Sequence, residues 1–256
     1  MRINKDRCVG CGECRNYCTL VRDEVFSCKR DPRSGRLYYE INEDECVDCG
    51  ACLRSGVCRT QALYMPENVG WPREIRAQFS NPKVVHPLTQ GPGRGTEECK
   101  TNEVTGRMHH GQVSIVVELG RPSSGCRFTD VEKVSRAFAA VGVPFEPENP
   151  CTVLMDDLKL GTFKKEVLNE KVLSTLVEAT VPLEKAEALL EAIRKVSGEV
   201  NCAFSVDIIS MVNEENGEFT WESQPILKKL HWEARPNGKL NTGLGRPLYQ
   251  ERKEEA

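Results

Sequence analysis

The distribution of cysteine constrains this chain more than any other feature of its sequence. Of its 13 cysteines, nine lie before residue 60, and they include two runs of the form Cys-x-x-Cys-x-x-Cys. A fourth cysteine follows the first run after three residues and the second run after five. The runs are Cys8, Cys11, Cys14 and Cys18, and then Cys46, Cys49, Cys52 and Cys58. In a chain with no sign of export, this spacing predicts metal ligands rather than disulfides.

The two runs belong to an internal repeat. Residues 3–14 align with residues 41–52, and both segments place a glycine before the third cysteine, Gly12 and Gly50. A duplicated half-domain with a pseudo-twofold axis is the simplest interpretation. Three thiolates on such a tight loop surround one corner of a cubane iron–sulfur cluster, and the loop's backbone N–H groups point at the inorganic sulfides. Glycine leaves room for the loop to curl close to the cluster.

The last cysteine of each run is expected to serve the other run's cluster, because it reaches across the pseudo-twofold axis. The predicted first site is Cys8, Cys11, Cys14 and Cys58, and the predicted second site is Cys46, Cys49, Cys52 and Cys18. A pair of zinc knuckles is the alternative, but zinc sites favour paired Cys-x-x-Cys motifs over a triplet with a distant fourth ligand. Cys28 is expected to be a spare thiol, or a substitute for Cys18 if the first run is distorted.

These motifs resemble those of bacterial-type ferredoxins with two [4Fe–4S] clusters. The resemblance covers residues 1–66 and implies a small electron-transfer module. The chain departs from the family pattern at the fourth ligands: Thr19 and Arg59 stand where proline usually follows, and the gap from Cys52 to Cys58 is longer than the common one. Residues 59–65 are expected to form the short closing strand of such a module.

Residues 67–111 are predicted to form an irregular connector. Five prolines and six glycines lie between residues 66 and 111, and proline at that density opposes a continuous helix or central strand. The segment Gly91–Gly95 could cradle a phosphate through its backbone N–H groups, but it follows no strand, so a plain loop is the favoured interpretation. His109 and His110 are expected to be surface residues.

The remainder predicts an α+β domain over residues 112–212. Alternating or β-branched apolar residues predict strands, and a 3.6-residue period predicts helices. The expected strands are 112–119, 152–155, 171–181 and 202–210, and the expected helices are 129–141 and 183–196. A capping box from Thr129 to Glu132 is expected to open the first helix. The order β-α-β-β-α-β predicts a ferredoxin-like topology, with two helices on one face of a four-stranded antiparallel sheet.

Residues 213–256 are predicted to form an extended tail, in which Trp221 and Trp232 are expected to pack on their own domain rather than on a partner. Four further cysteines lie apart from the two runs and have no Cys-x-x-Cys spacing. They are Cys99, Cys126, Cys151 and Cys202. Free thiols are the favoured interpretation of these residues, and a third metal site is the alternative.

Composition excludes several classes of function. The chain is 39% hydrophobic and 29% charged, which is typical of a soluble globular protein. Its net charge of −3 gives no indication of binding to nucleic acid or to an anionic membrane. No apolar run is long enough for a membrane span, and the N-terminus lacks a secretory signal, so a cytoplasmic location is expected.

Three functions stay open on this basis. The leading one is an iron–sulfur electron-transfer protein or subunit, which relays single electrons to a redox protein or larger reductase subunit in anaerobic metabolism. The second is a reductase in its own right, with flavin or substrate bound by residues 112–212, although no motif supports flavin. The third is a redox or ligand sensor. No catalytic residue is predicted.

A second resemblance bears on the first of these functions. Residues 90–155, through Gly91–Arg107 and the Gly120-Arg-Pro turn, are similar to part of the iron–sulfur proteins known as 6-hydroxynicotinate reductases. This similarity implies a subunit of an anaerobic reductase that acts on a ring or acyl compound. It assigns no substrate-binding residue.

Overall fold

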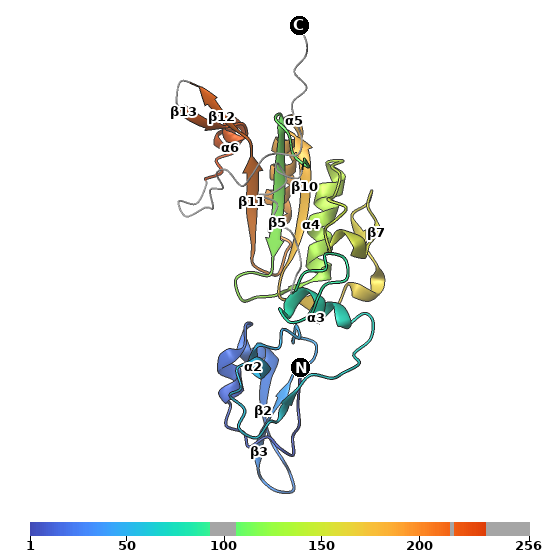
Figure 1. Ribbon diagram of the computed structural model, residues 1–256, viewed down its shortest axis with the longest axis vertical. Coiled ribbons are helices and arrows are strands. Elements are labelled where there is room, and N and C mark those ends of the chain that lie inside the picture. Colours follow the sequence, from blue (N-terminus) through green and yellow to red (C-terminus); the bar gives the residue numbers. More distant parts are fainter. Residues whose placement is uncertain (93–105, 216–217, 234–256) are drawn as a thin grey trace.

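The computed structural model describes residues 1–92, 106–215 and 218–233. It is a mixed α+β protein with small antiparallel sheets, as expected. A small N-terminal module, residues 1–66, forms one end of the long axis (Figure 1). A larger α+β body, residues 106–215 and 218–233, forms the other end. Helix α3 (Glu74–Ser80) lies between the two parts.

The N-terminal module reproduces the repeat seen in the sequence. Strands β1 (Arg2–Ile3) and β3 (Leu37–Ile41) each lead into a cysteine triplet, whose third cysteine lies in the 3-10 helix η1 (Glu13–Tyr17) and in helix α2 (Ala51–Arg54) respectively. Their antiparallel partners, β4 (Leu63–Tyr64) and β2 (Phe26–Arg30), each follow the fourth cysteine of a run. A short helix, α1 (Arg22–Val25), precedes β2. The expected closing strand over residues 59–65 is therefore present as β4, in a shorter form.

The same turn opens both triplet loops. The carbonyl of Asn4 accepts from the N–H of Cys8, and the carbonyl of Asn42 accepts from the N–H of Cys46, both at 3.0 Å. The side-chain oxygen of each asparagine also accepts from the N–H two residues later. Asparagine favours such turns because its side chain bonds to its own backbone. Local sequence thus sets the start of each loop.

The body is built on a three-stranded antiparallel sheet in the order β10-β5-β11. Its strands are β5 (Gln112–Leu119), β10 (Thr175–Pro182) and β11 (Phe204–Ser210). Helices α4 (Phe128–Ala140) and α5 (Leu183–Val196) pack against the face that carries Val113, Ile115 and Val117. The sequence patterns predicted β5 and α5 at their observed bounds.

The expected fourth strand of this sheet is not found among the described residues. Residues 152–155 instead form the 3-10 helix η3 (Thr152–Leu154), and β7 (Met155–Asp157) pairs only with β8 (Thr162–Phe163). Asn149 causes the difference, because its side chain accepts from the N–H of Cys151 and its carbonyl accepts from the N–H of Thr152. These bonds turn the chain where an edge strand would have to start.

Two other predictions need correction in detail. The expected strand 171–181 is divided into β9 (Lys171–Val172), which pairs with β6 (Cys126–Arg127), and β10. A further 3-10 helix, η4 (Lys165–Val167), precedes β9. The capping box does not form, because the carboxylate of Glu132 accepts instead from the N–H of Phe163 and pairs with Arg136. Helix α4 ends as expected, with Gly142 in the left-handed conformation at φ 68°.

The core of the body extends beyond the predicted domain. Ile75 and Phe79 of α3 belong to it, so the connector 67–111 is not irregular throughout. The described part of the expected tail contains regular structure: β12 (Val212–Glu215) pairs with β13 (Glu218–Trp221), and α6 (Gln224–Lys229) follows. Residues 216–217 and 234–256 of that tail lie outside the described residues. Leu227 and Leu230 are buried in the same core, and Trp232 packs against it, as expected. Trp221, in contrast, is 37% exposed, so the same expectation is wrong for this residue.

Several expectations concern other parts of the chain. Residues 93–95 of the glycine-rich loop and Cys99 lie outside the described residues. His110 lies at the surface, as expected, and the Nδ1 of its exposed ring lies 2.6 Å from the carboxylate of Glu222. Among the described residues, no helix combines the length and apolar character that crossing a bilayer requires.

Candidate metal centre

The two triplet loops share one backbone conformation. Gly12 and Gly50 have φ values of 74° and 70°, and the residues two positions earlier, Gly10 and Asp48, also have positive φ values of 69° and 53°. Two left-handed residues in such a short loop curl it tightly, a conformation that turns backbone N–H groups into a concave anion-binding nest. The sequence repeat therefore produces two equivalent curled loops.

Asp48 adopts this conformation without being a glycine, and its side chain is fixed by two cations. The buried carboxylate pairs with the N-terminal ammonium of Met1 and accepts from Nε of Arg73 at 3.0 Å. Burial opposes ionisation of Asp48, but these cations outweigh it and lower its pKa. The second loop is thus tied to the N-terminus and to α3.

The predicted first set of ligands comes together in the module. Burial, together with smaller contributions from the nearby thiols of Cys8, Cys11 and Cys58, raises the pKa of Cys14 to about 11. Two of the sulfurs are also hydrogen-bonded to the backbone: Cys8 accepts from the N–H of Tyr39 at 3.4 Å, and Cys58 accepts from that of Ala62 at 3.2 Å.

Cys58 differs from Cys14 in the direction of its pKa shift. Partial burial raises the pKa of its thiol, but hydrogen bonds from the Thr60 hydroxyl and from backbone N–H groups outweigh burial and lower it. Donors that stabilise a thiolate also favour its role as a ligand.

The predicted second set also comes together, including the cysteine from the other run. Burial, together with smaller contributions from Cys46, Cys49, Cys14 and Cys18, raises the pKa of Cys52 to about 12. Burial likewise raises the pKa of Cys18, and the thiol of Cys49 adds to this effect. The inclusion of Cys14 means that the two sets are neighbours. Thiols crowded in this way resist ionisation unless a cation binds them.

A cavity adjoins the second set. Its wall includes Cys18, Cys46, Cys49 and Cys52, and its volume is about 20 Å³. The rest of the wall is mainly apolar and includes the side chains of Met1, Leu20, Val25, Phe26, Ile41 and Val47. Four soft thiol donors beside an apolar wall suit an iron–sulfur cluster, because thiolates bind it and apolar surroundings exclude water from it.

The remaining cysteines stand apart from these two sets. Cys28 is exposed on β2, opposite Tyr39. Cys126 and Cys151 are buried in the body, where burial raises the pKa of Cys126 well above its usual value, with smaller contributions from Cys202 and Cys151. Among the described residues, no group of three or more His, Cys, Asp or Glu side chains is placed to hold a single metal ion. A cubane cluster holds its thiolates farther apart than a single metal ion does.

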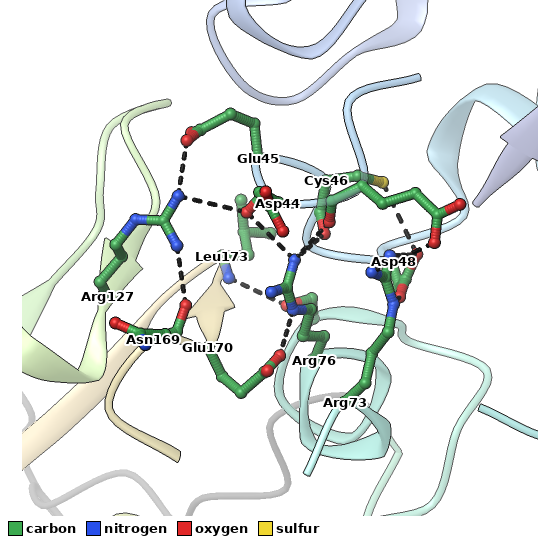
Figure 2. A network of polar contacts seen from close by, with 12 residues as sticks. Asp44, Glu45, Cys46, Asp48, Arg73, Arg76, Arg127, Asn169, Glu170 and Leu173 are labelled. Carbon is green, nitrogen blue, oxygen red and sulfur yellow. Dashed lines mark hydrogen bonds and ion pairs between the residues drawn. The ribbon is translucent and has the colours of Figure 1, made fainter. Parts of the chain in front are cut away.

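No sequence motif indicated the cations that anchor the second loop. Figure 2 shows these cations. The Arg76 side chain is only 4% exposed, and its Nη1 donates to the carbonyls of Glu43, Asp44 and Cys46 at 2.6, 3.1 and 2.9 Å. Its Nε pairs with the carboxylate of Glu170 in the body. One buried guanidinium therefore joins the loop of the second site to the body.

Two further cations act at the same interface. Arg127 donates to the carbonyl of Asp44 at 3.3 Å and to the carboxylate of Glu45 at 2.6 Å. The ammonium of Lys171 donates to the other carboxylate oxygen of Glu45 at 2.6 Å, and it also favours ionisation of the nearby Cys18. These residues come from β6 and β9, far away in sequence, so no local motif could have indicated them.

The first loop has a different environment. Its Val9 is 57% exposed, whereas Val47, at the same position of the second repeat, is 1% exposed. Cys11 is the only exposed cysteine of the eight predicted ligands. The repeat thus places one site at the surface and the other beneath the body.

Comparisons with protein families, curated proteins and solved structures gave no match to this chain. The case for any function therefore depends on the residues and their geometry.

Proposed function

We propose that this chain is an iron–sulfur electron-transfer protein, or the electron-transfer subunit of a larger oxidoreductase of anaerobic metabolism. Residues 1–66 would hold two [4Fe–4S] clusters in the manner of a bacterial-type ferredoxin. The ligands would be Cys8, Cys11, Cys14 and Cys58 at the first site, and Cys46, Cys49, Cys52 and Cys18 at the second. The partner would be a redox protein or a reductase subunit.

The observation that carries the proposal is the exchange of the fourth cysteines. Cys58 lies with the first triplet and Cys18 with the second, although each is closer in sequence to the other one. Crossed ligation of this kind is the arrangement of two-cluster ferredoxins. A structural zinc site has no need of it, since its four ligands normally come from two Cys-x-x-Cys pairs.

When bound, each cluster supplies a one-electron redox couple. The residues of the chain would hold it, exclude water and set its potential. At the second site Val47, Phe26 and Met1 form an apolar wall, and N–H donors reach the sulfurs of Cys8 and Cys58. Hydrogen bonds to sulfur and exposure to solvent are the main means by which a protein tunes such a cluster. The adjacency of Cys14 and Cys52 supports transfer between the sites.

The body would serve as the platform for the module. We interpret it as a ferredoxin-like unit that lacks one edge strand, and the strand order β10-β5-β11 supports this. This topology carries many unrelated functions, so it adds no activity by itself.

Metal analysis tests the proposal. Chain purified under anaerobic conditions should contain about eight iron and about eight acid-labile sulfide, because each cubane holds four of each. Stoichiometric zinc without sulfide would overturn the proposal. Iron near twelve per chain would add a third cluster and would bring Cys126, Cys151 and Cys202 into the ligand set.

A further inference from the structure

The two proposed sites differ in their access to an external protein. The second loop is covered by Arg73 and Arg76 and by the body (Figure 2). The first loop exposes Cys11 and Val9. An external electron carrier can therefore approach the first site most closely, and this step of the argument depends on the proposed function.

The hairpin of β2 and β3 stands directly beside the first loop, at the end of the molecule away from the body (Figure 1). The N–H of Tyr39 donates to the sulfur of Cys8. Gly10 packs so closely on the hairpin that an added Cβ would lie 2.7 Å from the carbonyl oxygen of Leu37. The guanidinium of Arg36 donates to the carbonyls of Lys5 and Asp6 at 2.8 and 2.9 Å. Hairpin and loop therefore present one continuous surface.

This surface is basic in a chain that is acidic overall. Residues 27–37 carry four cations, Lys29, Arg30, Arg33 and Arg36, against the single carboxylate of Asp31, which gives 4 − 1 = +3, whereas the whole chain has a net charge of −3. The carboxylate of Asp31 is turned into the hairpin, where it accepts from the N–H groups of Arg33 and Ser34 and from the Ser34 hydroxyl. All four cationic residues are exposed.

Two exposed apolar side chains belong to the same surface. Val9 is exposed on the first loop, and Leu37, which contacts Gly10, is exposed on the hairpin. Two apolar side chains on a basic surface fit a transient electron-transfer contact, which is small and relies on electrostatic steering more than on buried area.

We propose that the surface formed by Val9, Cys11, Leu37 and the basic hairpin docks an acidic one-electron carrier protein. One electron leaves the reduced carrier and enters the first site, with no bond made or broken and no proton transferred, and the reverse transfer uses the same contact. The second site and the body would then lie on the opposite side, toward the partner oxidoreductase.

The test uses the cluster-loaded full chain, reduced and mixed in a stopped-flow instrument with cytochrome c. Native cytochrome c is basic, and its succinylated form is acidic with the same haem, so the two probes differ chiefly in charge. At low ionic strength the acidic form should be reduced on the order of tenfold faster, and added salt should reduce the difference. Equal rates, or a faster basic form, would overturn the proposal.

Two double variants test whether the preference for the acidic form comes from the hairpin. Lys29→Glu with Arg33→Glu should remove most of the preference for the acidic form, because the side chains of these two residues make no structural hydrogen bond in the hairpin, whereas those of Arg30 and Arg36 do. Lys159→Glu with Lys195→Glu changes the net charge equally on the body and should keep the preference. Identical behaviour of the two variants would count against the hairpin as the docking surface.

A further measurement separates this proposal from the proposed function. Iron and sulfide content and the rate of electron transfer to a small uncharged quinone are measured for every variant. Missing clusters would overturn both proposals. Intact clusters with a normal quinone rate, but without a charge preference, would overturn only the docking surface.

Discussion

Replacement of Arg76 by methionine tests how the N-terminal module is attached to the body. The methionine side chain fills much of the same volume but makes none of the bonds of the guanidinium. The carbonyls of Glu43, Asp44 and Cys46 and the carboxylate of Glu170 would then each lose a partner. The second loop would lose its main connection to α3.

The magnitude follows from burial. Arg76 is 4% exposed, so water cannot replace its bonds without a rearrangement of the interface. Removal of one partner from a buried, hydrogen-bonded charge pair costs roughly 3–5 kcal/mol, mainly because the other groups stay buried and unsatisfied. We expect the module to lose about 4 kcal/mol of its free energy of unfolding, a large part of the stability of a typical domain.

Urea denaturation of the cluster-loaded chain provides the assay, with visible absorbance for the clusters and far-ultraviolet circular dichroism for the body. The wild type should show coincident transitions. Arg76→Met should separate them, with the clusters lost at the lower urea concentration. Arg76→Lys should give a smaller effect, because an ammonium keeps the charge but not the planar fork.

A matched control is Arg2→Met, which removes an exposed arginine that pairs with Glu43 at the surface. This change should leave both transitions in place, since exposed ion pairs contribute little. If Arg76→Met also left the two transitions coincident and shifted them by less than about 1 kcal/mol, the role assigned to the interface would be wrong.

The remaining predictions concern the ligands and the extent of the body. Cys18→Ser should change the electron paramagnetic resonance signal of the cluster held by Cys46, Cys49 and Cys52, and a change confined to the other cluster would contradict crossed ligation. Cys28→Ser should leave both signals unchanged, because this thiol is exposed on β2. A fragment of residues 70–233 should melt cooperatively without iron, whereas residues 108–215 should not. The shorter fragment loses Ile75, Phe79, Leu227 and Leu230 from the core, and burial of four such side chains contributes roughly 6 kcal/mol or more. Equal melting curves by circular dichroism would show that these residues are dispensable.

The sequence was most informative where the determining contacts are local. The alternation of apolar residues over Gln112–Leu119 and the helical period over Leu183–Val196 gave the bounds of β5 and α5. Glycine in the triplet loops indicated their curled backbone, which the positive φ values of Gly12 and Gly50 bear out. In each case the physical cause lies within a few residues of its effect.

The predictions from sequence were incomplete where contacts with distant parts of the chain decide the local structure. The strand expected at residues 152–155 is apolar enough for a sheet, but Asn149 turns the chain just before it, and the Asn149 side chain donates to the carboxylate of the distant Glu178 at 2.9 Å. The proline-rich connector contains α3 because Ile75 and Phe79 are buried in a core made by other segments. Nothing in the sequence around Arg76 distinguishes it from a surface arginine. Its partners, the carboxylate of Glu170 and three carbonyl groups, reach it only when the chain folds.

The divergence of the two repeats connects these observations. At one position of the curled loops the first repeat has Gly10 and the second has Asp48, and both adopt positive φ. Glycine lets Leu37 approach the first loop closely, without a side chain in between. Asp48 instead binds the N-terminal ammonium and Arg73, which fix the second loop to α3. The same backbone thus supports an exposed loop in one repeat and an anchored loop in the other. This asymmetry would suit the proposed electron-transfer function, in which the first site exchanges electrons with a mobile carrier and the second is held against the body.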